Sequence, residues 1–147
     1  MTLQRSKFAA IVLASFAAGS LLTARLMHIS QVKADSNRLF ELRIYHTVQG
    51  KQPALVSEFR DKVTKLFARH DLKALGYWSP ADPAVAENTF IYILAHPNKE
   101  DADKHWAAFR ADPEFQEMMK AQQAPDAKLV EKVDSTYMHP TDFSPVK

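Results

Sequence analysis

The sequence predicts an α+β fold in which two helices cover one face of an antiparallel four-stranded sheet. Two kinds of pattern carry this prediction. In some stretches apolar and polar residues alternate, which is typical of strands; in others apolar residues recur every three or four positions, which is typical of amphipathic helices. The stretches follow one another as strand, helix, strand, strand, helix, strand.

Residues 40–48 are predicted to form the first strand, because they alternate strictly and so give the strand two different faces. One face carries Phe40, Leu42, Ile44 and Val48, and the other carries Glu41, Arg43, Tyr45 and Thr47. Gly50 suits the turn that follows, and Pro53 suits the first turn of a helix.

Residues 53–70 have helical spacing and predict an amphipathic helix of nearly five turns. Residues 72–79 and 88–95 read as the second and third strands, the latter rich in β-branched and aromatic residues. The short loop between these two strands contains Pro80 and Pro83, so we expect the strands to form a hairpin.

Asn98 is expected to cap a second helix that runs through Arg110 and turns Ala102, Trp106 and Phe109 inward. Asp112 followed by proline is a second helix start, a capping residue with proline at the first helical position, and predicts a short helix. Residues 129–138 alternate again and predict the fourth strand, before a tail at 140–147.

This order of elements is the split βαβ arrangement of ferredoxin-like (βαββαβ) domains, with both helices on one face of the sheet. The other face carries too much aromatic surface to remain in water. A second copy packed face to face would cover it. We therefore expect a homodimer, a dimeric α+β barrel with a cavity between its two sheets.

The first 34 residues look like an export signal. Arg5 and Lys7 precede a 15-residue apolar run, residues 8–22, which is shorter than a membrane span needs. Cleavage after Ala34 would release the domain outside the cytoplasm, into the periplasm or medium; an uncleaved N-terminal membrane anchor is the alternative. The predicted organisation is a leader at 1–34, a linker at 35–38, a domain at 39–139 and the tail at 140–147.

Composition excludes several classes of function. The chain has no cysteine, which rules out disulfides, thiolate metal sites and a cysteine nucleophile. Four of its 19 basic residues lie in the acid-free leader, so the remainder carries 17 acids against 15 bases. No basic stretch suggests a nucleic-acid partner. Metal-ligand spacings, phosphate-binding loops and dinucleotide motifs are also missing from the sequence, and no metal site is predicted.

Five ordered stretches resemble the NIPSNAP domain family. They are Glu41–Tyr45, Gly50–Lys51, Leu66–His70, Gly76–Trp78 and Trp106–Phe115. The ordered set, which covers about residues 39–138, is more specific than any one stretch. The resemblance implies a fold of the dimeric α+β barrel group and brings no settled chemistry.

The candidate ligand-binding residues lie mainly on the strands. Arg43 and Tyr45 share a strand face with Glu41, and we assign that face to the cavity between sheets. Arg43 could hold an anionic group there, or the Glu41–Arg43 pair could be a structural ion pair. Tyr77 and Trp78 are neighbours on a strand and must face opposite ways, so one faces the cavity; Tyr92 could line the cavity or the core.

His105 is the remaining candidate. Related barrels bind or break down haem, which needs an axial donor above an apolar slot. His105 could be that donor, with Trp106 and Phe109 as walls, although a lone histidine on a helix is more often structural. No cofactor is predicted, and haem is kept as a minor alternative.

The sequence therefore predicts an exported NIPSNAP-like homodimer that binds a small molecule between its sheets. Whether the domain is an enzyme, for example one that uses oxygen without a cofactor, stays open at this point. The alternatives are a non-catalytic interaction module with a filled interior and, less favoured, a haem-binding or monooxygenase-like barrel.

Overall fold

The computed structural model describes residues 38–147. The predicted leader at 1–34, and most of the predicted linker, lie outside the described residues. Within residues 38–147, no helix is both long enough and apolar enough to cross a membrane.

The sheet has the predicted four antiparallel strands. They are β1 (Leu39–Thr47), β2 (Lys73–Trp78), β3 (Thr89–His96) and β4 (Val130–Met138). Their order across the sheet is β2-β3-β1-β4, so β1 and β3 are central. The α+β, ferredoxin-like fold predicted from the sequence is confirmed.

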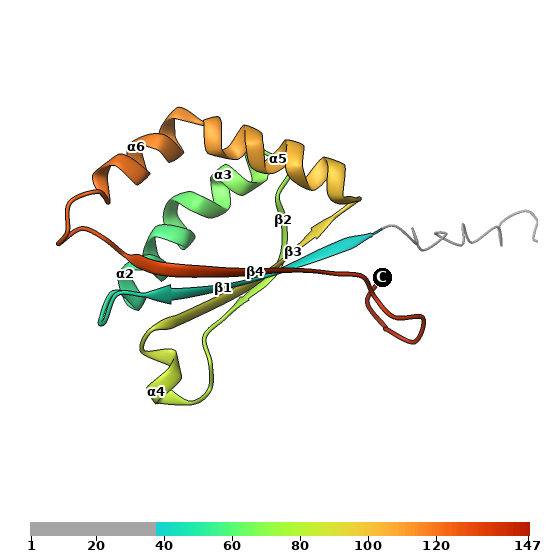
Figure 1. Cartoon of the computed structure of the whole chain (residues 1–147), viewed down its shortest axis with the longest axis horizontal. Coiled ribbons are helices and arrows are strands. Elements are labelled where there is room, and N and C mark those ends of the chain that lie inside the picture. The colour runs from blue at the N-terminus through green and yellow to red at the C-terminus, as the bar shows by residue number, and fades with distance from the viewer. Residues whose placement is uncertain (1–37) are drawn as a thin grey trace, which may run out of the picture. The chain divides into compact units, whose positions relative to one another are not determined.

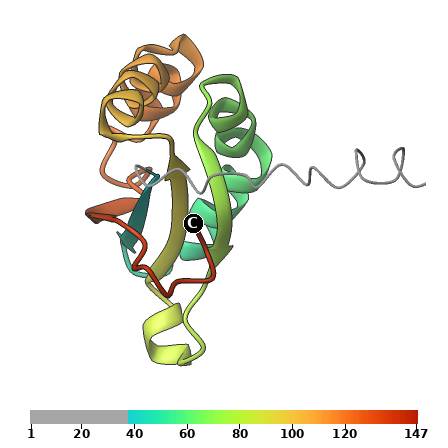
Figure 2. The ribbon, with the colours of Figure 1, turned by 90° about the vertical axis from the view of Figure 1, so that its right-hand side faces the viewer.

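All the helical segments of the two crossovers lie on one side of this sheet (Figures 1 and 2). The predicted first helix is a continuous run of α2 (Gln52–Glu58), the π-helical segment η1 (Phe59–Val63) and α3 (Thr64–Arg69). The second crossover contains α5 (Lys99–Ala111) and α6 (Pro113–Ala121). A short helix, α4 (Pro83–Ala86), forms within the loop that the sequence analysis expected between β2 and β3.

The predicted helix caps are present. The Asn98 side chain accepts a hydrogen bond from the Asp101 backbone nitrogen at 2.8 Å. Asp112 accepts one from the Glu114 nitrogen at 2.9 Å and so begins α6 directly after α5. These side chains satisfy backbone donors that the first turn of a helix leaves without partners.

The core fills the space between the sheet and the helices. The helices contribute Leu55, Phe59, Leu66, Phe67, Trp106 and Phe109, and β3 contributes Phe90, Tyr92 and Leu94. Along β3 from Phe90 onward, the even-numbered residues are buried and the odd-numbered ones are only partly covered. One face of the sheet therefore packs on the helices, and the other is open in a single chain.

The open face is largely apolar at its centre. Cross-strand pairs place Leu42 beside Ile93, and Ile44 beside Ile91. Trp78 pairs with Ile91 on the same face and is 47% exposed. Its ring lies over Gly76, where an added Cβ would come within 2.9 Å of the indole. This exposed aromatic surface is the feature from which the sequence analysis predicts a second copy.

Glu41, Arg43 and Tyr45 lie on the opposite side of the sheet from the one predicted. These side chains point toward the helices and not toward the open face. The Tyr45 ring packs edge-on against Phe59 at 5.5 Å, and the Arg43 guanidinium lies 4.6 Å from the centre of the Trp106 ring. Polar residues occupy the inner face because they find partners there.

We predict that residues 35–147 form a homodimer through the open face. Ile93→Glu places a charge at the centre of that face and should convert a dimer to a folded monomer, because a buried unpaired charge is costly. Light scattering measures the mass, and circular dichroism checks folding.

The control is Ala107→Glu, which places the same charge on an exposed position of α5. That variant should remain dimeric. A well-folded wild-type domain that is monomeric at micromolar concentration would refute the barrel dimer.

Candidate functional site

A cavity of about 620 Å³ lies between the sheet and the helices of one chain. Its floor is formed by β1 and β4, its walls by α2, η1 and α3 on one side and α5 on the other, and its roof by α6, which follows directly on α5. The wall side chains are mainly apolar: Leu55, Phe59, Val63, Phe67, Trp106, Phe109, Phe115, Met118 and Met119. Exposed lining residues, among them Arg110, Gln123 and Lys128, mark where the cavity meets solvent.

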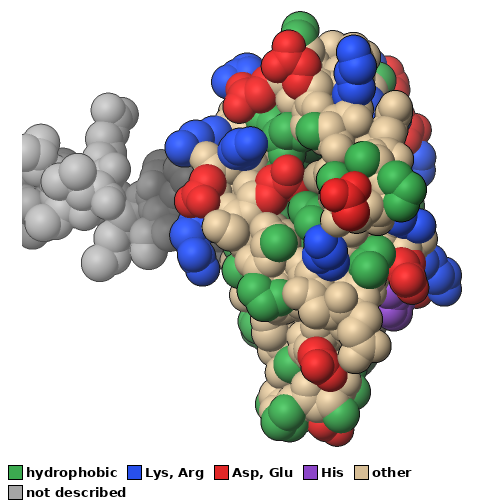
Figure 3. Space-filling view, turned by 90° about the vertical axis from the view of Figure 1, so that its left-hand side faces the viewer, with side chains coloured by type: hydrophobic (Ala, Val, Ile, Leu, Met, Phe, Trp, Pro, Cys, Tyr) green, Lys and Arg blue, Asp and Glu red, His purple; other side chains and the backbone are tan. Residues whose placement is uncertain are grey.

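The outer surface at this end of the molecule is mixed in character. On the face shown in Figure 3, acidic, basic and hydrophobic side chains are interspersed, and neither sign of charge forms a continuous patch. The apolar lining of the cavity thus lies behind a surface of mixed character.

Arg43 and Tyr45 form the polar part of the cavity floor. Arg43 Nη2 donates a hydrogen bond to the Tyr45 hydroxyl at 3.3 Å, and Arg43 Nη1 donates to Glu41 Oε1 at 3.0 Å. The Arg43 side chain is 19% exposed, so part of it is accessible from the cavity. The predicted Glu41–Arg43 ion pair is present.

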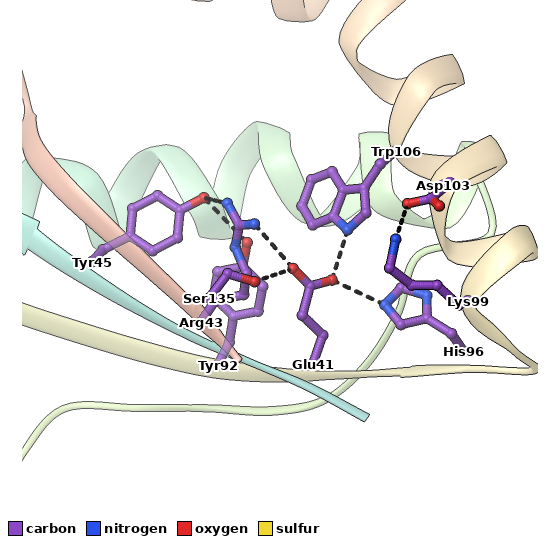
Figure 4. A network of polar contacts seen from close by, with 9 residues as sticks. All are labelled: Glu41, Arg43, Tyr45, Tyr92, His96, Lys99, Asp103, Trp106 and Ser135. Atoms are coloured by element: carbon purple, nitrogen blue, oxygen red, sulfur yellow. Dashed lines mark hydrogen bonds and ion pairs between the residues drawn. The ribbon is translucent and has the colours of Figure 1, made fainter. Parts of the chain in front are cut away.

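Glu41 is buried beside the cavity and accepts hydrogen bonds from four side chains (Figure 4). Besides Arg43, the donors are Trp106 Nε1 at 2.7 Å and Ser135 Oγ at 2.7 Å. His96 Nε2 lies 3.1 Å from the second carboxylate oxygen. These donors come from all four elements around the carboxylate: β1, β3, β4 and α5.

The hydrogen bonds decide the charge of Glu41. Burial alone raises the pKa of this carboxyl, but the bonds from His96, Trp106, Ser135 and Arg43 together outweigh it and lower the pKa to about 2. Glu41 is therefore ionised near neutral pH. Its negative charge balances the positive charge of Arg43.

Tyr45 is also tied to Tyr92. Their hydroxyl oxygens are 3.2 Å apart and their ring centres 5.5 Å apart. Tyr92 is fully buried, and burial raises its pKa well above the ordinary value. Of the two phenols, only Tyr45 lines the cavity.

The segment α6 roofs the cavity and is tied at both ends. At its start, Asp112 lies 2.7 Å from His70 Nε2 and accepts from Arg69 Nη1 at 3.0 Å. The bond from His70 is the main reason why the pKa of Asp112 falls to about 2. At its end, Gln122 Nε2 donates to Glu58 Oε2 at 2.8 Å, and burial raises the pKa of that carboxyl.

The structure brings together only some of the six candidate residues. Arg43 and Tyr45 line the cavity, and Tyr92 lies directly beneath Tyr45. Tyr77 is on the helix side but packs against Phe90, with ring planes 6° apart, outside the cavity. Trp78 lies on the open face of the sheet, and His105 does not line the cavity. Neither side chain lines this cavity. Tyr77 is turned toward the helices and Trp78 toward the open face, so a place for Trp78 at the wall of a space between two sheets stays a prediction.

Several residues of the site were not singled out from the sequence. Ser135 and His96 carried no signal of their own, although His96 continues the inward register of Tyr92 and Leu94 along β3. Glu58 and Val133, which also line the cavity, read as ordinary helix and strand positions. Their roles depend on contacts between distant parts of the chain.

Among the residues that the structure describes, no group of three or more histidine, aspartate or glutamate side chains could hold a metal ion. The haem alternative gains no support from this cavity. His105 is half-buried on α5, outside the lining, and the two aromatic residues expected beside it line the cavity without it.

Comparison with known proteins gives a consistent answer. The family model NIPSNAP matches residues 40–145. A NIPSNAP family protein of unknown function from Agrobacterium tumefaciens superposes with a TM-score of 0.66 at 22% identity, over 76% of this chain and 96% of that chain. An uncharacterised NIPSNAP-like domain protein from Burkholderia xenovorans gives 0.63 at 19% identity, over 75% and 90%. At such identities the structural likeness shows the fold alone, and no curated protein matches.

We predict that Glu41→Gln destabilises the domain by about 3 kcal/mol near neutral pH, because the ionised carboxylate loses its charge-assisted bonds. The folded-state pKa of Glu41 is below its ordinary value of 4.5, so its stabilisation is present above pH 4.5 and is lost as the pH falls toward about 2. The difference in unfolding free energy between wild type and variant should shrink over that window.

Denaturant unfolding at a series of pH values measures this difference. Asp112 titrates in both proteins, so its contribution cancels from the difference in unfolding free energy. Glu131→Gln, an exposed glutamate on β4, is the control and should leave stability nearly unchanged. A constant difference between pH 6 and pH 2 would contradict an ionised Glu41.

Proposed function

The chain belongs to the NIPSNAP family, and from that premise we propose that its domain binds a small, largely apolar molecule in the cavity between the sheet and the helices. The polar end of the molecule contacts Arg43 and Tyr45. The sequence predicts a binding site between the sheets of two chains, whereas the site proposed here lies within one chain.

The observation that carries this proposal is the cavity itself. Its volume of about 620 Å³ is in the range of small-molecule sites, and its lining combines many apolar side chains with a few polar ones. Protein interiors are normally close-packed, so an apolar space of this size is unusual, and a bound ligand would explain it.

The rival function is a non-catalytic interaction module with a filled interior. An open cavity weighs against it. The paired charges on the floor also weigh against a purely structural interior, since burying Arg43 and Glu41 has a cost that well-packed apolar residues would avoid.

Export and dimer formation belong to the same proposal. The basic residues before residues 8–22 and the length of that apolar run favour an export signal. The apolar open face of the sheet favours a second copy as partner. In such a dimer each chain retains its own cavity on the far side of its sheet.

The binding proposal predicts saturable uptake of a neutral apolar probe, with one site per chain. N-phenylnaphthylamine is suitable because its fluorescence rises in an apolar pocket. Val133 lines the cavity opposite Tyr45 in the strand register, so Val133→Phe fills the space and should weaken binding by about tenfold or more.

Ala107→Phe is the matched control, because it adds the same ring at an exposed position of α5 outside the lining. It should bind like wild type. Thermal unfolding of each variant confirms that it is folded. Non-saturable fluorescence, or binding that is equal in Val133→Phe and wild type, would refute the proposed site.

The export proposal predicts that the full chain leaves the cytoplasm. Cells that express it are fractionated, and mass spectrometry of the N-terminus separates a chain cleaved near Ala34 from an anchored, uncleaved one. A variant with Arg5 and Lys7 changed to glutamate should be exported poorly, because the positive end of a signal is retained inside. An intact, soluble wild-type chain in the cytoplasm would be the opposite of the expected result.

A further inference from the structure

We infer that the polar group recognised at the base of this cavity is an uncharged carbonyl oxygen and not a carboxylate. The inference rests on the proposed function, since it specifies the ligand of the same site. An arginine in a pocket first suggests an anionic ligand, whereas the group inferred here is neutral.

The base of the cavity offers hydrogen-bond donors. Arg43 has five N–H donors and no acceptor; among the described residues its side chain donates to Glu41 and Tyr45, and its buried Nε has no partner. The Tyr45 oxygen must therefore accept from Arg43.

The Tyr92 hydroxyl completes this argument. Tyr92 is fully buried, and among the described residues Tyr45 is the one hydrogen-bond partner of its hydroxyl. A buried proton without an acceptor is costly, so Tyr92 donates to Tyr45. Two donors then occupy the Tyr45 oxygen, which leaves its own proton for an acceptor in the cavity that Tyr45 lines. A ligand oxygen that accepts hydrogen bonds fits both Tyr45 and Arg43.

The charge balance at the base of the cavity also favours a neutral ligand group. The positive charge of Arg43 is already balanced by the ionised Glu41 3.0 Å away. His96 adds no charge when it donates through Nε2, and a second proton on its buried Nδ1 would find no acceptor within the described part of the chain. A carboxylate ligand would bring a second negative charge to one guanidinium and would lose its hydration. A carbonyl oxygen accepts the same hydrogen bonds without that cost.

The charges at the mouth do not change this balance at the base. Arg110 and Lys128 are exposed, so water and salt screen them. Glu58 also lines the cavity, and it is bonded to Gln122 at the end of α6 and not to the base. The body of the ligand meets phenylalanine, tryptophan and methionine side chains, which suit an aromatic or other flat apolar framework.

Three probes with one naphthalene body test the inference: acetylnaphthalene, a neutral ketone; naphthoate, its carboxylate counterpart; and ethylnaphthalene, which has no oxygen. We expect the ketone to bind about tenfold or more tightly than naphthoate, and more tightly than ethylnaphthalene. The infrared carbonyl stretch of the bound ketone should lie at lower frequency than in a hydrocarbon solvent, because two donors polarise it.

Tyr45→Phe removes one of these donors. It should shift the carbonyl stretch back toward higher frequency and weaken the ketone severalfold, while ethylnaphthalene binds as before. Tyr137→Phe, on β4 outside the cavity lining, is the matched control. It should change neither the carbonyl stretch nor the affinity for the ketone. In Glu41→Gln the charge of Arg43 is no longer balanced, so the preference should move toward naphthoate. If that variant does not fold, the Tyr45→Phe comparison decides alone.

The outcomes separate the inference from the proposed function. A carbonyl stretch that is unshifted, or naphthoate that binds as tightly as the ketone and loses affinity in Arg43→Met, overturns the inference and leaves the binding site standing. If neither ethylnaphthalene nor N-phenylnaphthylamine binds, the proposed function fails and the inference fails with it.

Discussion

The buried carboxylate of Glu41 is the interaction on which the rest of the structure depends. A charge in that position is tolerated only while its donors remain in place, because an unpaired buried carboxylate is far more costly than the hydrogen bonds that satisfy it. The four donors reach it from three strands and from α5. Glu41 thus fixes how α5 lies on the sheet and holds the Arg43 guanidinium against the face of Trp106. The geometry of the cavity base follows from this one side chain.

The two helical walls of the cavity are joined by side-chain hydrogen bonds near the two ends of α6. On one wall, η1 carries Phe59 and Val63 into the lining. A π-helical turn inserts one extra residue into the helical register and is frequent at functional sites. On the other wall, α5 and α6 meet at Asp112, which binds to the end of α3. Aromatic edge-to-face contacts around Phe59 and Phe67 stiffen the space between them.

Periodicity was enough to predict the fold. The alternation in 40–48 and the helical spacing in 53–70 are local signals, and the caps at Asn98 and Asp112 depend on residues only two or three positions away. The orientation of β1 was not predictable in this way. A rule that turns the apolar face inward places Glu41 and Tyr45 on the wrong side. The Glu41 partners Trp106 and Ser135 lie 65 and 94 residues further along the chain, where no local pattern reveals them. Arg43 and Tyr45 were predicted as ligand contacts from their chemistry, whereas the cavity that they line could be found only in three dimensions.

The attachment of α6 has a kinetic consequence. The polar contacts described for this roof lie near its two ends, at Asp112 and Glu114 and at Gln122. Local opening of such a segment costs only part of the free energy of global unfolding. For the proposed ligand, the residence time beneath α6 would then depend on how often this short helix opens while the sheet and Glu41 stay in place. Affinity and exchange rate can therefore be tuned separately in this fold, the first through the floor and the second through the roof.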